Sequence, residues 1–234
     1  MSKNADMAKN KGNIVIVLGM HRSGTSAFAG TLKIAGYDLG KDLMPANEYN
    51  VKGYFENNKI VELNDKILGY FNASWDSMFF LPEKWEKDER LRQCKIDAIQ
   101  IINSEFNGKD NIAIKDPRFG ILLPFWKSVF ESLQFKPNYC VLLRSPTEIS
   151  LSLENRDHFS IQKSHILWTN YLMAIELSTR AEKRFFIDYT DFLKAPTEAL
   201  KSHSKYFKFK DSFPLPEMET EIEEFVDSKY RHYN

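Results

Sequence analysis

The segment that most constrains the fold of this chain is GMHRSGTS at residues 19–26. Its two glycines, with Thr25 and Ser26 after them, fit the phosphate-binding pattern G-x-x-x-x-G-K-[ST] at every fixed position except the lysine, which Thr25 replaces. The β-branched apolar run at residues 13–18 is typical of a buried parallel strand, and a helix can begin at Thr25. Strand, glycine turn and helix start predict a loop that holds a phosphate on unpaired N–H groups at a helix N-terminus.

The missing lysine limits which phosphate compound this loop can serve. In P-loop nucleotide-binding proteins the lysine contacts the β- and γ-phosphates, so we do not expect an ordinary ATP or GTP site. Arg22 is the cationic side chain inside the loop, and it can reach a group that lies across the loop's mouth. The alternative interpretation is a plain glycine turn in an α/β domain.

A second pattern lies at residues 138–152. The apolar run 138–143 predicts another buried strand, which ends at Arg144. Ser145, a proline and Glu148 then form a helix-start signature, and Ser152 follows Arg144 by eight residues. An arginine at a strand end and a hydroxyl two turns into the next helix can converge on one anion, and the arginine fork suits phosphate. The alternative is an arginine paired with a carboxylate and a solvated serine.

Together these patterns resemble the sulfotransferases that use 3′-phosphoadenosine 5′-phosphosulfate (PAPS). The loop is similar to that family's 5′-phosphosulfate loop, K/R-[ST]-G-T-[ST], which implies that PAPS is bound by Arg22, Ser23, Gly24, Thr25 and Ser26. Arg144 and Ser152 match the family's 3′-phosphate pair. Tyr189, in a segment similar to Y-x-D-x-x-x-x-P, matches a tyrosine that lies near the adenine. The loop and the KDPR segment at 115–118 are most similar to short bacterial sulfotransferase-like proteins.

The chain also departs from the aryl and steroid branch of that family. That branch carries K-T-H-L-P with a catalytic histidine, whereas this chain reads Lys115-Asp116-Pro117-Arg118 and keeps only the lysine. The branch has a tryptophan after its loop, where this chain has Ala27, and a C-terminal R-K-G, for which the tail offers only a lysine at 229 and an arginine at 231. Part of the adenosine and 3′-phosphate contacts is therefore unassigned.

Sulfuryl transfer needs a base for the acceptor proton and positive charge at the leaving oxygen. The resemblance implies that Arg22 and the loop N–H groups, together with Lys115, neutralise the leaving oxygen. With that charge supplied by the protein, the transfer requires no metal. Glu56 lies where some carbohydrate sulfotransferases place a catalytic glutamate, although it can equally be a carboxylate at a helix start. Asp116 is the rival base, but the cations on either side make it a poor one and suit it to orienting the acceptor or holding Arg118.

Histidines give weaker candidates. His158, after the helix that carries Ser152, is a third candidate base, and a lone histidine at a helix end is usually a cap or a surface group. The five histidines of the chain show no metal-ligand spacing, so the sequence predicts no metal site.

Composition fits one soluble enzyme domain. The chain has 234 residues and a formal net charge of zero, from 32 Lys and Arg against 32 Asp and Glu, which argues against broad nucleic-acid binding. Its two cysteines form no disulfide framework and favour a reducing compartment. With no signal peptide and no apolar run long enough for a membrane span, we expect a cytoplasmic protein. We expect a disordered segment at 1–12 and a single α/β domain over 13–234.

Strands are predicted at residues 13–18, 111–115, 138–143 and 184–188, and helices at 26–36, 57–71, 86–106, 121–133, 146–156, 163–182 and 190–204. This alternation predicts a P-loop-type parallel sheet with helices on both faces and ligands at the carboxyl ends of the strands.

Several loop features are less specific. The segment 40–56 reads as a loop that can close over an acceptor. An aromatic cluster near it, in which a sugar could stack but core packing is commoner, comprises Trp75, Phe79, Phe80 and Trp85. The acidic stretch after Pro214 predicts a solvated helix.

Three function classes are open from sequence alone. The first is a PAPS-dependent sulfotransferase with a hydroxyl or amine acceptor, first a carbohydrate, then an aryl alcohol or a lipid-linked glycan. The second is a P-loop kinase or NTPase with an altered loop, and the third is a catalytically silent nucleotide-binding module. The sequence does not indicate the oligomeric state.

Overall fold

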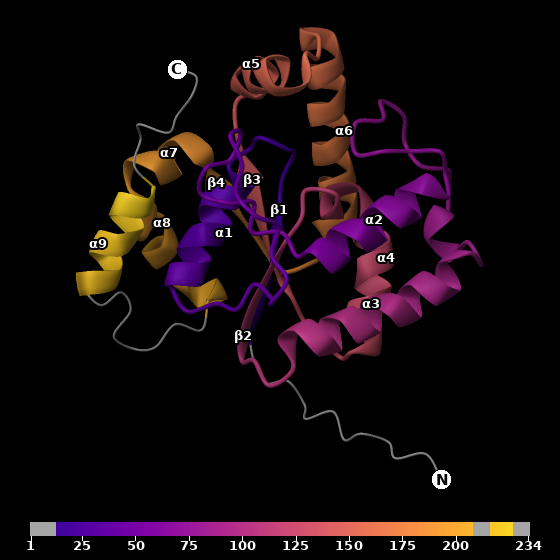
Figure 1. The fold of residues 1–234 in the computed structure, drawn as a ribbon, viewed down its shortest axis with the longest axis horizontal. Helices are drawn as coiled ribbons and strands as arrows, with labels where there is room; N and C mark the ends of the chain where they lie inside the picture. The colour runs from indigo at the N-terminus through magenta and orange to yellow at the C-terminus, as the bar shows by residue number, and fades with distance from the viewer. Residues whose placement is uncertain (1–12, 208–215, 227–234) are drawn as a thin grey trace.

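The protein is described here by a computed structural model that covers residues 13–207 and 216–226. The segment 1–12, predicted to be disordered, and the basic residues at 229 and 231 lie outside the described residues. Within those residues, four parallel strands form one sheet in the order β2-β1-β3-β4 (Figure 1). The strands are β1 (Asn13–Leu18), β2 (Asn111–Lys115), β3 (Asn138–Leu143) and β4 (Arg184–Asp188), and each has the predicted bounds.

Helices cover both faces of this sheet. They are α1 (Thr25–Ile34), α2 (Asn58–Gly69), α3 (Leu91–Phe106), α4 (Phe119–Ser132), α5 (Pro146–Asp157), α6 (Ile161–Thr179), α7 (Tyr189–Lys194), α8 (Pro196–Ser202) and α9 (Pro216–Phe225), with short 3₁₀ turns η1 (Trp85–Lys87) and η2 (Ser204–Tyr206). The predicted fold class, a parallel α/β sheet with helices on both faces, is confirmed.

Successive side chains of β1 point alternately into two hydrophobic cores, one on each face of the sheet. Ile14, Ile16 and Leu18 pack with residues of α2, α3, α4 and α6, whereas Val15 and Val17 pack with residues of α1, α7, α8 and α9. Figure 1 shows these two groups of helices on opposite sides of the strands. Because both faces are covered, β1 is apolar at nearly every position, which is the pattern that identifies it in the sequence.

Strand order locates the site. The chain passes from β1 to β2 on one side and then returns past β1 to β3 on the other. Ligands of such sheets bind where the order reverses, outside the carboxyl ends of the strands. The glycine loop follows β1 at this point, so the fold places it at the expected crevice.

Some predicted helix ends were wrong for local reasons. The helix predicted at 86–106 begins at Leu91, after the separate turn η1. The helix predicted at 190–204 is broken, because Ala195 before Pro196 takes an extended φ of −148° and ends α7. Ser145 does not cap α5 with its side chain, and the Glu148 side chain pairs with Arg144. Over residues 13–207 and 216–226, no helix combines the length and apolarity that crossing a membrane requires.

The first prediction tests the core. Ile16 is fully buried in β1, so Ile16→Ala should lower the free energy of unfolding by about 2 to 5 kcal/mol through lost packing and a residual cavity. Ile96 on α3 is 46% exposed, and Ile96→Ala should change that free energy by about 0.5 kcal/mol or less. Urea unfolding measures both, and equal losses would contradict the assignment of β1 to the centre of the fold.

Candidate active site

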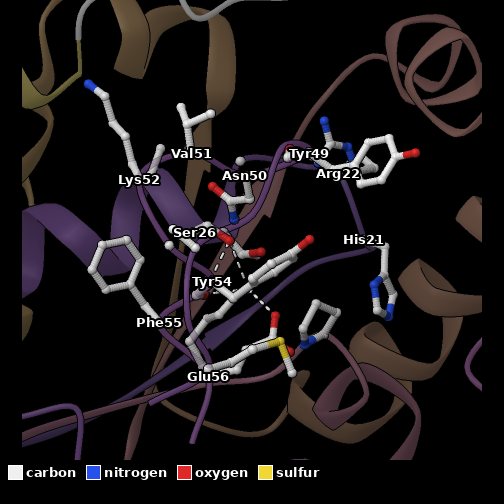
Figure 2. Close-up of a pocket in the computed structure, with 18 of the residues that line it drawn as sticks. His21, Arg22, Ser26, Tyr49, Asn50, Val51, Lys52, Tyr54, Phe55 and Glu56 are labelled. Atoms are coloured by element: carbon white, nitrogen blue, oxygen red, sulfur yellow. Dashed lines mark hydrogen bonds and ion pairs between the residues drawn. The ribbon is translucent and has the colours of Figure 1, made fainter. Parts of the chain in front are cut away.

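A cavity of about 580 Å³ lies at the carboxyl ends of the strands (Figure 2). Segments that follow all four strands line it, and so does the loop 44–56, which we call the strap. Most predicted site residues line this one cavity: Arg22, Gly24, Thr25, Ser26, Glu56, Lys115, Arg144, Ser152 and Tyr189. Ser23, Asp116 and His158 are not among the lining residues.

The glycine loop needs unusual backbone geometry. Gly24 precedes α1 with φ of +92°, and a Cβ there would lie 2.1 Å from the ring of Tyr189, so only glycine fits. Arg22 also has a left-handed φ of +69°, which is costly for a residue with a side chain. Arg144 Nη1 donates to the Arg22 carbonyl at 2.9 Å and so holds that conformation. Ser23 is a buried residue of the loop, and its hydroxyl has no hydrogen-bond partner among the residues that the structure describes.

Arg144 and Ser152, the predicted anion pair, line the same cavity, and each already has another partner. Arg22 Nε donates to Ser152 Oγ at 2.7 Å, which joins the glycine loop to α5. Arg144 Nε donates to Glu148 at 2.8 Å, and its guanidinium lies 4.7 Å from the ring centroid of Tyr189. Arg144 thus has a carboxylate partner, as the alternative interpretation expected, and it also lines the cavity.

Sequence reasoning missed a third arginine. Arg156 lines the cavity one helical turn after Ser152 on α5, and its Nε bonds Asp157 at 2.7 Å. Burial lowers the pKa of Arg22, and repulsion from Arg156 and then Arg144 lowers it further. Its position four residues after Ser152 places both on one face of α5, and this spacing could have identified Arg156 from the sequence.

Lys115 links the loop, the strap and the predicted base. Its ammonium donates to Ser26 Oγ at 2.9 Å, to the Tyr54 carbonyl at 3.0 Å and to Glu56 Oε1. Glu56 is buried, and its other oxygen lies 3.7 Å from Arg118. Burial raises the pKa of Glu56; Lys115 opposes this rise, and the nearby charge of Asp116 adds to it. A buried carboxylate with a raised pKa that faces a cavity can exchange a proton.

Asp116 lies behind the cavity wall. It is fully buried and accepts hydrogen bonds from Asn64 Nδ2 at 2.9 Å, from the Arg118 backbone at 2.9 Å and from Arg118 Nη1 at 3.0 Å. Its acceptor positions are therefore engaged within the protein. This geometry suits the role of holding Arg118, one of the roles that the sequence analysis offered in place of a base.

His21 is a second residue that sequence reasoning missed. Its ring lies 4.3 Å from Trp75 between centroids, and its shielded Nε2 has no hydrogen-bond partner in the described part of the chain. Burial lowers the pKa of His21, and the nearby cations Arg118 and Arg156 lower it further, so the imidazole is neutral near pH 7. The only available signal was its place inside the loop.

The predicted aromatic cluster is not assembled. Trp75 packs between His21 and Phe159, whereas Trp85 belongs to the core under α2 and α3. Phe79 and Phe80 are each more than half exposed and do not line the cavity. A stacking platform of these four residues was therefore a wrong interpretation, because their side chains go to different layers.

The strap contacts the glycine loop, whereas the sequence predicted a loop at 40–56 that closes over an acceptor. Arg22 Nη1 donates to the Tyr49 carbonyl at 3.2 Å, and Ser26 Oγ donates to the Tyr54 carbonyl at 3.3 Å. Figure 2 shows Ser26, Tyr54 and Glu56 on the same part of the cavity wall, with Tyr49 near Arg22. Backbone carbonyls of the strap therefore accept hydrogen bonds from groups predicted to bind phosphate.

Comparisons with known proteins bear on the fold. A scan against protein-family models and a search of curated protein sequences found no match. A sulfotransferase domain from the Synechococcus PCC 7002 olefin synthase shares 14% identity over 88% of this chain and 77% of its own, with a TM-score of 0.47. A sulfotransferase domain from the curacin biosynthetic pathway also shares 14% identity, over 88% of this chain and 76% of its own, with a TM-score of 0.46. Sulfotransferase STF1 from Mycobacterium tuberculosis shares 11% identity, with 98% of this chain and 73% of that chain covered and a TM-score of 0.52. This last similarity shows that the chain has a sulfotransferase-like fold, as the sequence resemblance predicted.

The second prediction concerns the two carboxylates on Arg118. Asp116→Asn should lower the free energy of unfolding by about 3 to 5 kcal/mol, because it leaves a largely buried guanidinium short of a charged partner. Asp65 pairs with the same arginine at 2.6 Å but is 51% exposed, so Asp65→Asn should cost less than about 1 kcal/mol. Urea unfolding measures the free energy of unfolding of both variants. An equal decrease for Asp65→Asn and Asp116→Asn would show that burial does not determine the cost of losing a carboxylate partner of Arg118.

Proposed function

We propose that the protein is a PAPS-dependent sulfotransferase that acts on a hydroxyl or amine acceptor, with a carbohydrate as the first candidate. One observation carries this proposal. A lysine-less phosphate loop, the Arg144 and Ser152 pair, and the Glu56 and Lys115 pair line the same cavity. The sulfotransferase-like fold supports the proposal independently of these side chains.

The charge of the cavity fits this donor. Among the described residues, six Lys and Arg side chains and two carboxylates line it, so these walls carry an excess of positive charge for a compound with several anionic groups. Arg22 and the N–H groups at the start of α1 would hold the 5′-phosphosulfate. Arg144 and Ser152, with Arg156 beside them, would hold the 3′-phosphate, and Tyr189 would lie near the adenine.

The remaining residues would handle the proton and the leaving oxygen. PAPS supplies the sulfuryl group, whose sulfur gains a bond to the acceptor oxygen or nitrogen and loses its bond to the phosphate oxygen. Glu56 would take the acceptor proton, because it faces the cavity and burial raises its pKa. Lys115 and Arg22 would neutralise the phosphate oxygen that is released.

We place this reaction in the cytoplasm. Both cysteines, Cys94 and Cys140, are buried free thiols, as expected in a reducing compartment. The carbohydrate acceptor rests on the resemblance to the short bacterial sulfotransferase-like proteins, and the acceptor screen should therefore begin with glycans.

The third prediction concerns the 3′-phosphate. Adenosine 3′,5′-bisphosphate should bind far more tightly than 5′-AMP or Mg-ATP, without added metal. Arg144→Ala removes a charge-assisted contact of roughly 1.5 to 3 kcal/mol, so it should weaken bisphosphate binding about tenfold to a hundredfold and leave 5′-AMP nearly unchanged. Arg92→Ala, at an exposed site on α3, is the control. Calorimetric titration measures these affinities, and equal binding of bisphosphate and 5′-AMP would exclude the 3′-phosphate site.

The fourth prediction concerns the base. Glu56→Gln keeps the shape and removes the basicity, so it should reduce turnover about a hundred- to ten-thousandfold while bisphosphate affinity is retained. Because a base works only when ionised, the wild-type rate should fall as pH drops through the raised pKa of Glu56, above the usual range for glutamate. Glu48→Gln, on the same segment but outside the cavity lining, is the control.

The assay is transfer of radiolabelled sulfuryl from PAPS to a glycan acceptor across a pH series. If Glu56→Gln keeps more than about a tenth of the rate while a folded Asp116→Asn loses it, the assignment of the base is inverted.

A further inference from the structure

Under the proposed function Ser26 and Lys115 would contact the donor's 5′-phosphate, and in the structure both donate to the Tyr54 carbonyl oxygen. It accepts hydrogen bonds from Ser26 Oγ at 3.3 Å and from Lys115 Nζ at 3.0 Å. The ammonium has three hydrogens, and its other two contacts are Ser26 Oγ and Glu56. Before either group can donate to a ligand oxygen, it must release this carbonyl.

The next residue along the strap is strained. Phe55 has a left-handed φ of +55°, a conformation that a bulky side chain rarely adopts. This φ helps to orient the Tyr54 carbonyl toward Ser26. Figure 2 shows the Phe55 ring on the other side of the strap from Glu56, and it packs edge-on against Phe225 at 5.9 Å.

Backbone hydrogen bonds hold the strap on both sides of the peptide between these two residues. On one side, Met44 N donates to the Glu56 carbonyl at 2.7 Å and fixes the chain after Phe55. On the other side, Gly53 N donates to the Asn50 carbonyl at 3.0 Å, and Gly53 has a φ of +97° that few other residues tolerate. A strained peptide next to a glycine, between two anchored points, is suited to a local turnover.

We propose that the peptide unit between Tyr54 and Phe55 turns over when the 5′-phosphate of the donor or of its bisphosphate product binds, so that the Phe55 N–H replaces the Tyr54 carbonyl at that phosphate. A half-turn moves φ of Phe55 from the left-handed to the extended region, where phenylalanine is unstrained. It also removes an acceptor oxygen that would repel the anion, and it frees Ser26 and Lys115 to donate. The inference rests on the proposed function and adds a backbone N–H to the donor site.

Opposing free-energy contributions decide which of the two orientations of this peptide is favoured. The carbonyl-in state makes two hydrogen bonds and carries the strain of Phe55, whereas the turned state loses those bonds and gains charge-assisted ones to the anion. Residue 55 therefore sets the balance through its tolerance of positive φ. A residue that tolerates positive φ should favour the carbonyl-in state and weaken anion binding.

The test compares Phe55→Gly with its matched control Phe55→Ala. Both variants lose the contact with Phe225, but only glycine adopts positive φ at little cost. Adenosine 3′,5′-bisphosphate should therefore bind roughly three- to tenfold more weakly to Phe55→Gly than to Phe55→Ala in calorimetric titration. Equal affinities, or tighter binding to the glycine variant, would overturn the inference.

A crystal structure of the wild-type protein with the bisphosphate gives a second readout that needs no variant. The expected result is a negative φ at Phe55 with its N–H toward the 5′-phosphate. A wild-type protein that binds the bisphosphate with the Tyr54 carbonyl still on Ser26 would overturn the turnover alone and leave the proposed function standing. A wild-type protein that does not bind the bisphosphate would overturn both.

Discussion

The buried ammonium of Lys115 is the contact on which the rest of the site depends. The register of β2 beside β1, with Val17 opposite Lys115, sets where this side chain leaves the sheet. Taking an ammonium out of water costs several kcal/mol unless its hydrogen bonds are replaced. Ser26, the Tyr54 carbonyl and Glu56 replace them, from α1 and from the strap. One cation therefore fixes the helix start, the strap and the proposed base relative to one another.

The position of this cation explains how the loop can lack a lysine of its own. In the usual pattern the lysine is part of the loop and reaches along the phosphates. Here Lys115 reaches Ser26 from the neighbouring strand, on the side where Glu56 lines the cavity. Under the proposed function, positive charge and a base are then close together where the acceptor enters, and Arg22 approaches from the other side of the loop.

Some of this arrangement was predictable from sequence because it needs only local information. The strands are buried apolar runs, and residues after parallel strands meet at one edge of the sheet, so the cavity could be assembled from four separate motifs. The break at Pro196 and the diversion of Glu148 from capping to an ion pair depend on tertiary contacts. The Tyr54 carbonyl is a backbone group and leaves no side-chain pattern. The sequence does not distinguish His21 and Arg156 from surface residues, because the elements that pack around them are distant in the chain.

Three of the four arginines that line the cavity in the described part of the chain differ in how their charge is balanced. Arg144 is offset by Glu148 and Arg156 by Asp157, but Arg22 bonds the neutral Ser152 hydroxyl and a strap carbonyl. Its lowered pKa records burial and repulsion that these neutral partners do not cancel. Under the proposed function, a bound anion would offset that repulsion and accept new hydrogen bonds from Arg22.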